Sequence, residues 1–293
     1  ALAAEVAQTV AWQTSPYRQP VIGWAADIAS MRLPDLRAWY ERWYTPSNAT
    51  LVVVGDVEPA AIKRLADQYF GSIARRDIAP PRARPEVGQH GEKRLIVRNE
   101  KVQLPHLMMA YKTPTMTQIG QPGPDGKLVE AWEIYALDVL AAVLDGGSSA
   151  RFTRELVRGQ EIASQVGTYF QSMSRLPDMF SIDATPREGH DLAALEAAIR
   201  AQLEAIKAAP PTVEELARVK TQVVADTVYQ QDSMFYQAMI IGTLESVGLS
   251  WRLRDEYAAA IRQITPEQVQ AVARRYLDRD RSTVAWLLPE EAR

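Results

Sequence analysis

Cysteine is absent from this 293-residue sequence, which excludes disulfides and thiolate metal sites. Histidine occurs only three times. The formal net charge is only −3, so neither nucleic acid nor an anionic membrane is expected as a partner. No apolar run reaches the ~20 residues that span a bilayer, and the first residues lack the basic start of a secretory signal. A hydrophobic content of 47% with 24% charged residues is typical of a globular protein.

The hydrophobic pattern that is present predicts helices and strands along most of the chain. Helices are expected over residues 2–14, 34–44, 58–70, 129–144, 149–158, 191–208, 212–230, 233–248, 252–263 and 266–277. Strands are expected over residues 49–55, 93–99, 104–113, 162–172, 178–185 and 282–289. Asp56 is expected to cap the third of these helices, and Gly71 to end it in the left-handed conformation. Two later helices begin with T-x-x-E/Q capping boxes, Thr212 with Glu215 and Thr265 with Gln268.

A proline-rich stretch divides the chain. Residues 72–92 show no hydrophobic period and contain three prolines, Pro80, Pro81 and Pro85, which is typical of a linker. We therefore expect a first segment over residues 1–75, a linker over 76–92, and a complete second domain over 93–293.

The sequence also contains one long-range repeat. "LPDLRAWYERWYTPSNATLVVV", from Leu33, aligns without gaps with "TPEQVQAVARRYLDRDRSTVAW", from Thr265, at an offset of 232 residues. Such a period is far too long for a solenoid and is close to the size of a domain, so it indicates duplication of a whole domain. A chance match of two helix–turn–strand patterns is the alternative.

A duplication would make the first copy incomplete. It ends near residue 75, so we expect that it begins before residue 1 and that roughly 150 of its residues or more are missing. The chain does not begin with methionine, which agrees with a natural start elsewhere. Each copy mixes helices with strands, which predicts an α+β fold with helices packed on a mainly antiparallel sheet.

The first copy carries the pattern Tyr-x-Pro-x-Asn-Ala-x-Leu-Val-Val-Val-Gly-Asp, from Tyr44 to Asp56. Together with "LPHLMMAYKTP", "LAAVLDGGSSARFTRELV" and "TPEQVQAVARRYL", this pattern resembles the pitrilysin/insulinase-type zinc metallopeptidases over essentially the whole chain, and in particular their bacterial members with two-domain subunits. The resemblance implies two homologous α+β domains and the hydrolysis of peptides inside a chamber closed by two halves.

Enzymes of that family hold zinc with an H-x-x-E-H motif and a later glutamate. None of the three histidines, His90, His106 and His190, begins or ends such a motif. In the order that the resemblance implies, the motif and the third ligand would precede residue 1. We therefore expect zinc in the parent protein, no metal in this chain, and no peptidase activity from this chain alone.

Two interpretations of the family resemblance remain open. The chain is either the C-terminal portion of a zinc-dependent metalloendopeptidase, or part of a non-catalytic scaffold or substrate-presenting subunit. In relatives whose far half binds the peptide, an arginine and a tyrosine seven residues later contact it, and the matching positions here are Val157 and Ser164. The lack of this pair favours a zinc-bearing half whose partner is a second family subunit or another copy. An unrelated α+β binding module would require the repeat to be accidental.

The resemblance also bears on location and on contacts with the peptide. Related bacterial proteins imply the periplasm or cell envelope, and the cytoplasm is the alternative. Arg151, Arg154 and Arg158 recur at helical spacing and form a basic stripe. A solvated surface is the plain interpretation of this stripe. The sharper one is contact with acidic groups of a peptide or a partner subunit in the chamber.

Other conspicuous residues are expected to be structural. "DGGSSARF", residues 145–152, lacks the spacing of a phosphate-binding loop and fits a helix C-cap followed by a serine N-cap. His106 lies on a predicted strand among apolar neighbours, where a hydrogen-bonded structural histidine is expected rather than a ligand. Trp39, Tyr40 and Trp43 are expected to pack in a core or in a seam between domains.

Overall fold

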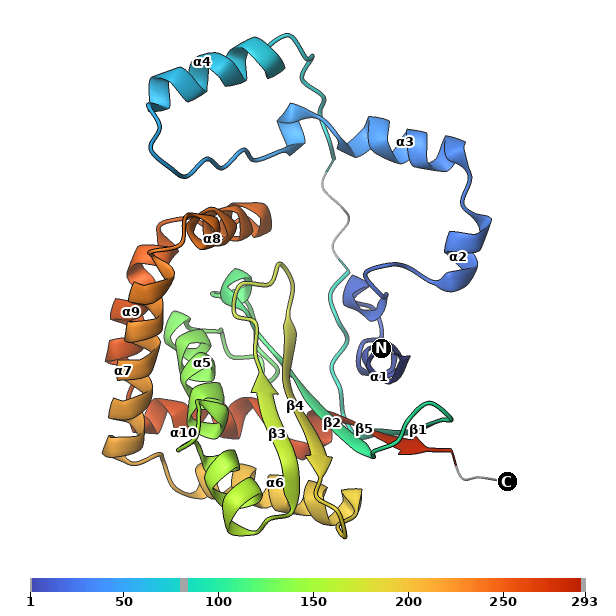
Figure 1. Ribbon diagram of the computed structural model, residues 1–293, viewed down its shortest axis with the longest axis vertical. Helices are drawn as coiled ribbons and strands as arrows, with labels where there is room; N and C mark the ends of the chain where they lie inside the picture. The colour runs from blue at the N-terminus through green and yellow to red at the C-terminus, as the bar shows by residue number, and fades with distance from the viewer. Residues whose placement is uncertain (1, 80–83, 291–293) are drawn as a thin grey trace.

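The computed structural model describes residues 2–79 and 84–290. Its strands are β1 Lys93–Asn99, β2 His106–Thr113, β3 Ala163–Tyr169, β4 Asp178–Pro186 and β5 Ser282–Pro289 (Figure 1). The helices before the sheet are α1 Leu2–Ala11, α2 Ala25–Ser30, α3 Leu33–Trp43 and α4 Pro59–Phe70. The later helices are α5 Ala131–Asp145, η4 Thr153–Gly159 (a π-helix), α6 Leu192–Ala208, α7 Val213–Gln230, α8 Met234–Val247, α9 Leu253–Gln263 and α10 Pro266–Tyr276. Short 3-10 turns are η1 Pro16–Arg18, η2 Pro46–Asn48, η3 Met116–Gln118 and η5 Arg279–Arg281.

The described strands form one sheet in the order β1-β5-β2-β4-β3. The last strand, β5, is inserted between two early ones. It pairs in parallel with β1, where Leu95 lies opposite Ala285, and antiparallel with β2, where Met109 lies opposite Val284. The pairs β2–β4 and β3–β4 are also antiparallel. The predicted α+β fold with a mainly antiparallel sheet is therefore confirmed.

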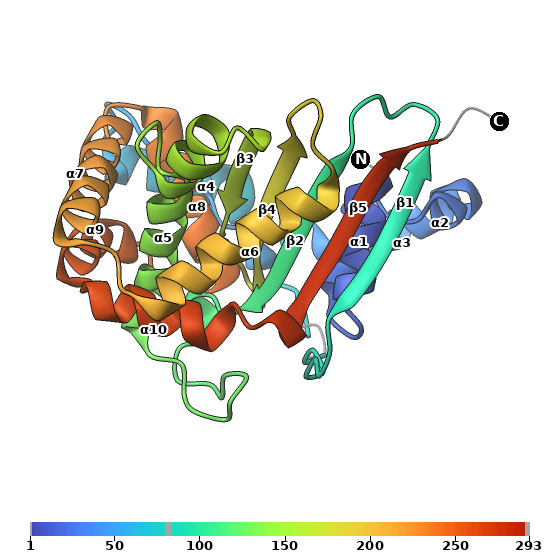
Figure 2. The same cartoon turned by 90° about the horizontal axis from the view of Figure 1, so that it is seen from below.

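One face of this sheet carries the core. Alternate residues of a strand point to opposite faces, and on β2 Leu107, Met109 and Tyr111 are the buried set. Figure 2 shows α6 and α10 lying across this face. Helix α5 is apolar around most of its circumference because it packs against β3 and is covered in turn by α7, α9 and α10.

Helix α1 packs against the strands at the β1 end of the sheet, on the face opposite α6 (Figure 2). It contacts β5, β1 and β2. The Lys93 ammonium, at the start of β1, donates to the carbonyl oxygens of Val10 and Ala11 at 2.9 and 3.0 Å. These oxygens belong to the unpaired last turn of α1, where a cation is favourable. The first residues of the chain are thereby fixed to the sheet of residues 93–289.

A single carboxylate, that of Glu86 in the predicted linker, holds this segment against the residues that follow α1. Glu86 accepts hydrogen bonds at 2.9 Å from the backbone N–H groups of Gln13, Thr14 and Ser15, and it forms an ion pair at 2.6 Å with Lys112 of β2. Although burial opposes the charged form, these donors lower the pKa of Glu86 to about 2. The linker is therefore anchored on its C-terminal side. The predicted linker prolines Pro80 and Pro81 lie outside the described residues.

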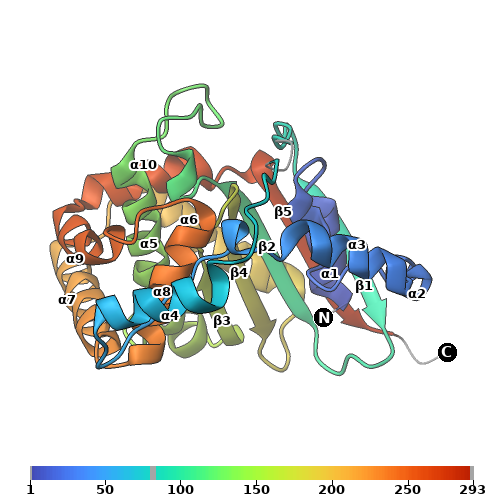
Figure 3. The ribbon, with the colours of Figure 1, turned by 90° about the horizontal axis from the view of Figure 1, so that it is seen from above.

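Between η1 and the linker, the chain forms an arm that consists of α2, α3, η2, an extended stretch and α4. We call the five strands and their covering helices, residues 93–289, the sheet unit. Seen from above, α2, α3 and α4 lie across the top of the sheet unit (Figure 3). Thr50 to Val53 line a cavity together with residues of α8 and the turn after it, such as Ile241 and Trp251. A Cβ atom at Gly242 of α8 would lie 3.8 Å from Val52 Cγ2, so Val52 packs close to the α8 backbone.

The strand predicted over residues 49–55 is wrong for this structure. The stretch is extended, but no strand pairs with it in the described part of the chain. Its repeat partner is β5, whose backbone is hydrogen-bonded on both sides. The same contrast holds for the aligned tyrosines, since Tyr276 is 0% exposed and Tyr44 is 60% exposed. Apolar sequence alone does not make a strand when neighbouring strands are lacking.

Three further local predictions about the arm are corrected. The N-cap of α4 is Glu58, with no side-chain cap, and not Asp56. Gly71 has φ −63° and ψ −26°, so it continues the helical conformation and is not left-handed. Packing of the aromatic residues of α3 in a core is wrong for Trp39 and Tyr40, which are 56% and 58% exposed, and the alternative, packing in a seam between domains, stays a prediction. Both side chains line an open apolar cavity with Trp43, Phe70 and other residues of the arm.

Several helix ends in the sheet unit agree with the sequence, but the serine N-cap expected after the glycine-rich turn is wrong, because the helical run begins at Arg151, directly after Ala150. Both capping boxes are confirmed, because Glu215 N–H and Gln268 N–H donate to the hydroxyl groups of Thr212 and Thr265. The glycine-rich turn ends α5, with Gly146 N–H bonded to Ala142 O and the following Gly147 at φ +92°.

Substituting Glu86 by glutamine should lower the free energy of unfolding at pH 7 by about 2 kcal/mol, because the Lys112 charge and three N–H groups lose a carboxylate. The folded-state pKa lies below the ordinary 4.5, so this stabilisation is complete above pH 4.5 and is lost as the pH falls toward 2. Urea denaturation at several pH values measures it. Glu58→Gln is the matched control, since Glu58 makes no cap bond. An E86Q effect that persists unchanged at pH 2 would contradict the assignment.

Hydrogen exchange should separate the two copies of the repeat. The amides of residues 51–54 should exchange at least about a hundredfold faster than those of residues 283–286, because only the second set lies in a sheet. Exchange measured by mass spectrometry on the intact chain tests this, with the aligned segment as internal control. Equal protection of both segments would show that the first has strand partners.

Candidate functional site

The histidines do not form a metal centre in the described residues. His90 and His190 are exposed, and they lie on different segments. No group of three or more His, Cys, Asp or Glu side chains that could hold a metal ion occurs within residues 2–79 and 84–290. The residues present therefore do not fit a zinc ion, and no catalytic step through zinc is assigned to this part of the chain.

His106 is hydrogen-bonded, as the sequence predicts. Its Nδ1 lies 3.2 Å from Thr185 Oγ1, and its Nε2 lies 3.2 Å from Asp183 Oδ1. Both partners belong to the adjacent strand β4 and lie on the sheet face opposite the core, because the alternate residues Ile182 and Ala184 are buried. The imidazole thus joins two strands across the face.

The three predicted arginines have different surroundings. Arg151 makes a bidentate pair with Glu215 at 3.0 and 2.7 Å, and its side chain is only 12% exposed. Arg154 pairs with Glu155 at 2.7 Å and approaches Glu215 at 3.6 Å, whereas Arg158 is exposed. Arg151 therefore holds the start of α7 against η4, whereas Arg154 and Arg158 are exposed to solvent. Contact of the three arginines with a peptide remains a prediction.

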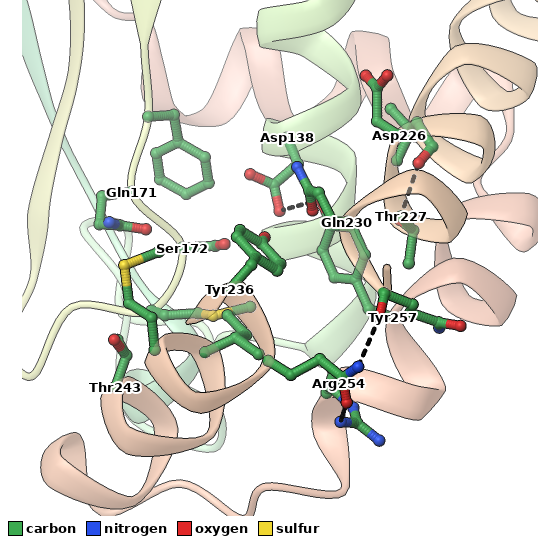
Figure 4. Close-up of a pocket in the computed structure, with 17 residues that line it drawn as sticks. Asp138, Gln171, Ser172, Asp226, Thr227, Gln230, Tyr236, Thr243, Arg254 and Tyr257 are labelled. Carbon is green, nitrogen blue, oxygen red and sulfur yellow. Dashed lines mark hydrogen bonds between the residues drawn. The ribbon is translucent and has the colours of Figure 1, made fainter. Parts of the chain in front are cut away.

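A cavity of about 470 Å³ lies beside α5, bounded by α7, α8, α9 and the segment that follows β3 (Figure 4). Figure 4 shows Asp138, Ser172, Tyr236 and Tyr257 pointing toward one another at one end of it. The Tyr257 hydroxyl donates to Asp138 Oδ2 at 3.2 Å, which links α9 to α5. Four separate elements thus bring polar groups together beside an otherwise apolar core.

Burial raises the pKa of Asp138 to about 7, although hydrogen bonds from Ser172 and Tyr257 favour its charged form. The pKa of Tyr257 is in turn raised well above its ordinary value, first by burial and then by the neighbouring Asp138. A carboxyl group of this kind can gain or lose a proton near neutral pH when its surroundings change.

The sequence predictions missed this site. The available signal was an acidic residue between apolar neighbours in the run "EIYALDVLAAVLD" of α5, since a carboxylate is rarely found on the buried part of a helix without a partner. The partners of Asp138 lie 34 and 119 residues further along the chain, at Ser172 and Tyr257, and only the tertiary fold brings them together.

Comparison with known proteins identifies the family. Residues 30–223 match the family described as the peptidase M16 inactive domain. The chain belongs to this family, and the resemblance to pitrilysin/insulinase-type zinc metallopeptidases is confirmed. It is 26% identical over 284 residues to the zinc protease PqqE of Helicobacter pylori, covering 94% of this chain and 59% of that protein. It therefore spans well under two thirds of the length of this relative.

Solved structures share the fold. A protease from Helicobacter pylori superposes with a TM-score of 0.85 at 25% identity, over 95% of this chain and 64% of that one. A peptidase M16 inactive domain from Pseudomonas fluorescens gives 0.79 at 19% identity, over 100% and 66%. The first half of the periplasmic protease PqqL from Escherichia coli gives 0.77 at 16% identity, over 99% and 62%. The described helices are too short or too polar to cross a membrane.

Replacing Arg151 by glutamine should lower the free energy of unfolding by about 2 kcal/mol, because it leaves the half-buried Glu215 without its bidentate partner. Arg158→Gln is the matched control and should change stability by less than about 0.5 kcal/mol. Urea denaturation at pH 7 measures both. Equal effects of the two substitutions would contradict the different roles that the contacts indicate.

Proposed function

We propose that this chain is the C-terminal portion of a zinc-dependent metalloendopeptidase that hydrolyses peptides in a closed chamber. The observation that carries the proposal is the repeat: α3 and residues 49–55 align with α10 and β5, yet only the second copy lies in a sheet. The membership of the M16 family and the 59% coverage of a protein named a zinc protease support it. On this proposal, residues 1–75 belong to a first domain whose strands precede residue 1.

In that assembly this chain would supply structure, not chemistry. The described residues contain no group of three or more side chains that could hold a metal ion, whereas their sheet unit has a closed core and several buried ion pairs. A rigid unit of this kind is suited to form part of a chamber wall and to hold the catalytic domain in place. Peptides would be the substrate, and the closing half would be a second family subunit or another copy of the same protein.

A non-catalytic scaffold or substrate-presenting subunit is the second candidate. It is favoured by the match to an inactive domain, which is a property of the residues in hand. It differs from the first candidate only in what precedes residue 1. Because the related PqqL is described as periplasmic, we further propose the periplasm or cell envelope as the location, with the cytoplasm as the alternative.

Peptide hydrolysis by two purified proteins tests the proposal. Residues 1–293 alone, assayed with a fluorogenic peptide library and added zinc, should show no cleavage above the blank, because the described residues cannot hold the ion. The full-length protein from the same gene should cleave, and a chelator should abolish cleavage. Chelator-sensitive cleavage by 1–293 would overturn the assignment of the metal site to another segment. A full-length protein that binds no zinc and cleaves nothing would leave the scaffold function.

A further inference from the structure

The cavity beside Asp138 combines a carboxyl group with aromatic rings. Besides Asp138, its lining includes Phe170 from the end of β3, Tyr236 from α8 and Tyr257 from α9. The negatively polarised faces of aromatic rings together with a carboxylate form the usual chemical surroundings of bound organic cations. A volume of about 470 Å³ is within the range of small-molecule sites and exceeds what one basic side chain needs.

Two of the rings are held in position by other rings behind them. Phe170 stacks on the buried Phe180 of β4, with ring centroids 6.2 Å apart. Tyr257 packs at 5.8 Å against Tyr135 of α5, and its hydroxyl is fixed by Asp138. The site is therefore largely preformed, so a ligand would not have to order these groups when it binds.

The carboxyl group of Asp138 has no cationic partner among the described residues, unlike the buried Glu133. Glu133 lies five residues before Asp138 on the same helix and forms an ion pair with Arg275 at 2.6 Å. Asp138 has hydroxyl partners and no ion pair with a described Lys or Arg. The one guanidinium in the lining belongs to Arg254. It lies at the other end of the cavity in Figure 4 and is engaged by Asp255 at 2.9 Å.

We propose that this cavity binds a guanidinium or ammonium group, carried by a basic side chain or by a small organic cation, with Asp138 as its counter-ion. The rings of Phe170, Tyr236 and Tyr257 would surround the cation, and the apolar side chains of the wall would contact its methylene stem. The inference does not rest on peptidase activity, because every group in it belongs to this chain.

Calorimetric titration with N-butylguanidinium and with its uncharged analogue N-butylurea tests the proposal. The cation should bind at least about tenfold more tightly than the urea, because the two differ in charge and hardly in shape. Asp138→Asn should remove this preference while keeping the side-chain volume. Asp183→Asn, on the opposite face of the sheet, is the matched control and should leave the preference unchanged.

Proton release gives a second readout that a general loss of structure would not reproduce. At pH 6 Asp138 is mostly protonated, so binding of a cation should release a proton, and the heat should depend on the ionisation enthalpy of the buffer. At pH 8.5 the carboxylate is already ionised and the release should vanish. The other ionisable groups that face or influence this end of the cavity are Tyr135 on α5, Asp226 on α7, Tyr236 on α8, and Arg254, Glu256 and Tyr257 on α9.

A third measurement distinguishes a small free cation from a basic side chain of a peptide. A blocked tripeptide with a central arginine is compared with N-butylguanidinium: tighter peptide binding identifies a basic side chain within a chain, and weaker peptide binding identifies a small free cation. Either result supports the cation site. Equal affinity for the cation and the urea, or an unchanged preference in a folded Asp138→Asn variant, would overturn it. The same holds if no binding of the cation is detected.

Discussion

A β-strand must find partners for its backbone N–H and C=O groups, and this constraint determines how the molecule is organised. Strand β5 satisfies it on both edges, because it lies between β1 and β2, which precede it in the sequence. Residues 49–55 have a similar sequence and no such place in the described structure. One copy of the repeat therefore closes a core, while the other leaves tryptophan and tyrosine rings on the surface.

Most of the sheet unit could be predicted from local sequence. Short runs rich in apolar residues located β1 and β5 to the residue, and capping boxes at Thr212 and Thr265 located the starts of α7 and α10. The prediction failed where the outcome depends on distant partners. The stretch 49–55 has the composition of a strand but lacks neighbours, and the predicted burial of Trp39 required a surface that is not among the described residues.

The candidate site was less predictable than the fold for the same reason. The three arginines that begin with Arg151 could be recognised by their spacing. The spacing did not indicate that Arg151 forms an ion pair with Glu215. Asp138 looked like an interruption of an apolar helix, and its importance comes from what the fold places around it. Elsewhere in the unit, buried carboxylates such as Glu86 and Glu133 have cationic partners, so they contribute structure. Among the described residues, Asp138 accepts hydrogen bonds only from the hydroxyl groups of Ser172 and Tyr257, so its carboxyl group remains available to a cationic ligand.

The attachment at Glu86 has a mechanical consequence. Because one carboxylate joins residues 13–15 to the end of the linker, the chain leaves the sheet unit and returns to it at the same point. The two ends of the arm are therefore held together, and the entropic cost of closing such a loop rises only slowly with its length. Insertions in the arm would therefore cost little free energy and would leave the packing of the strands below it undisturbed.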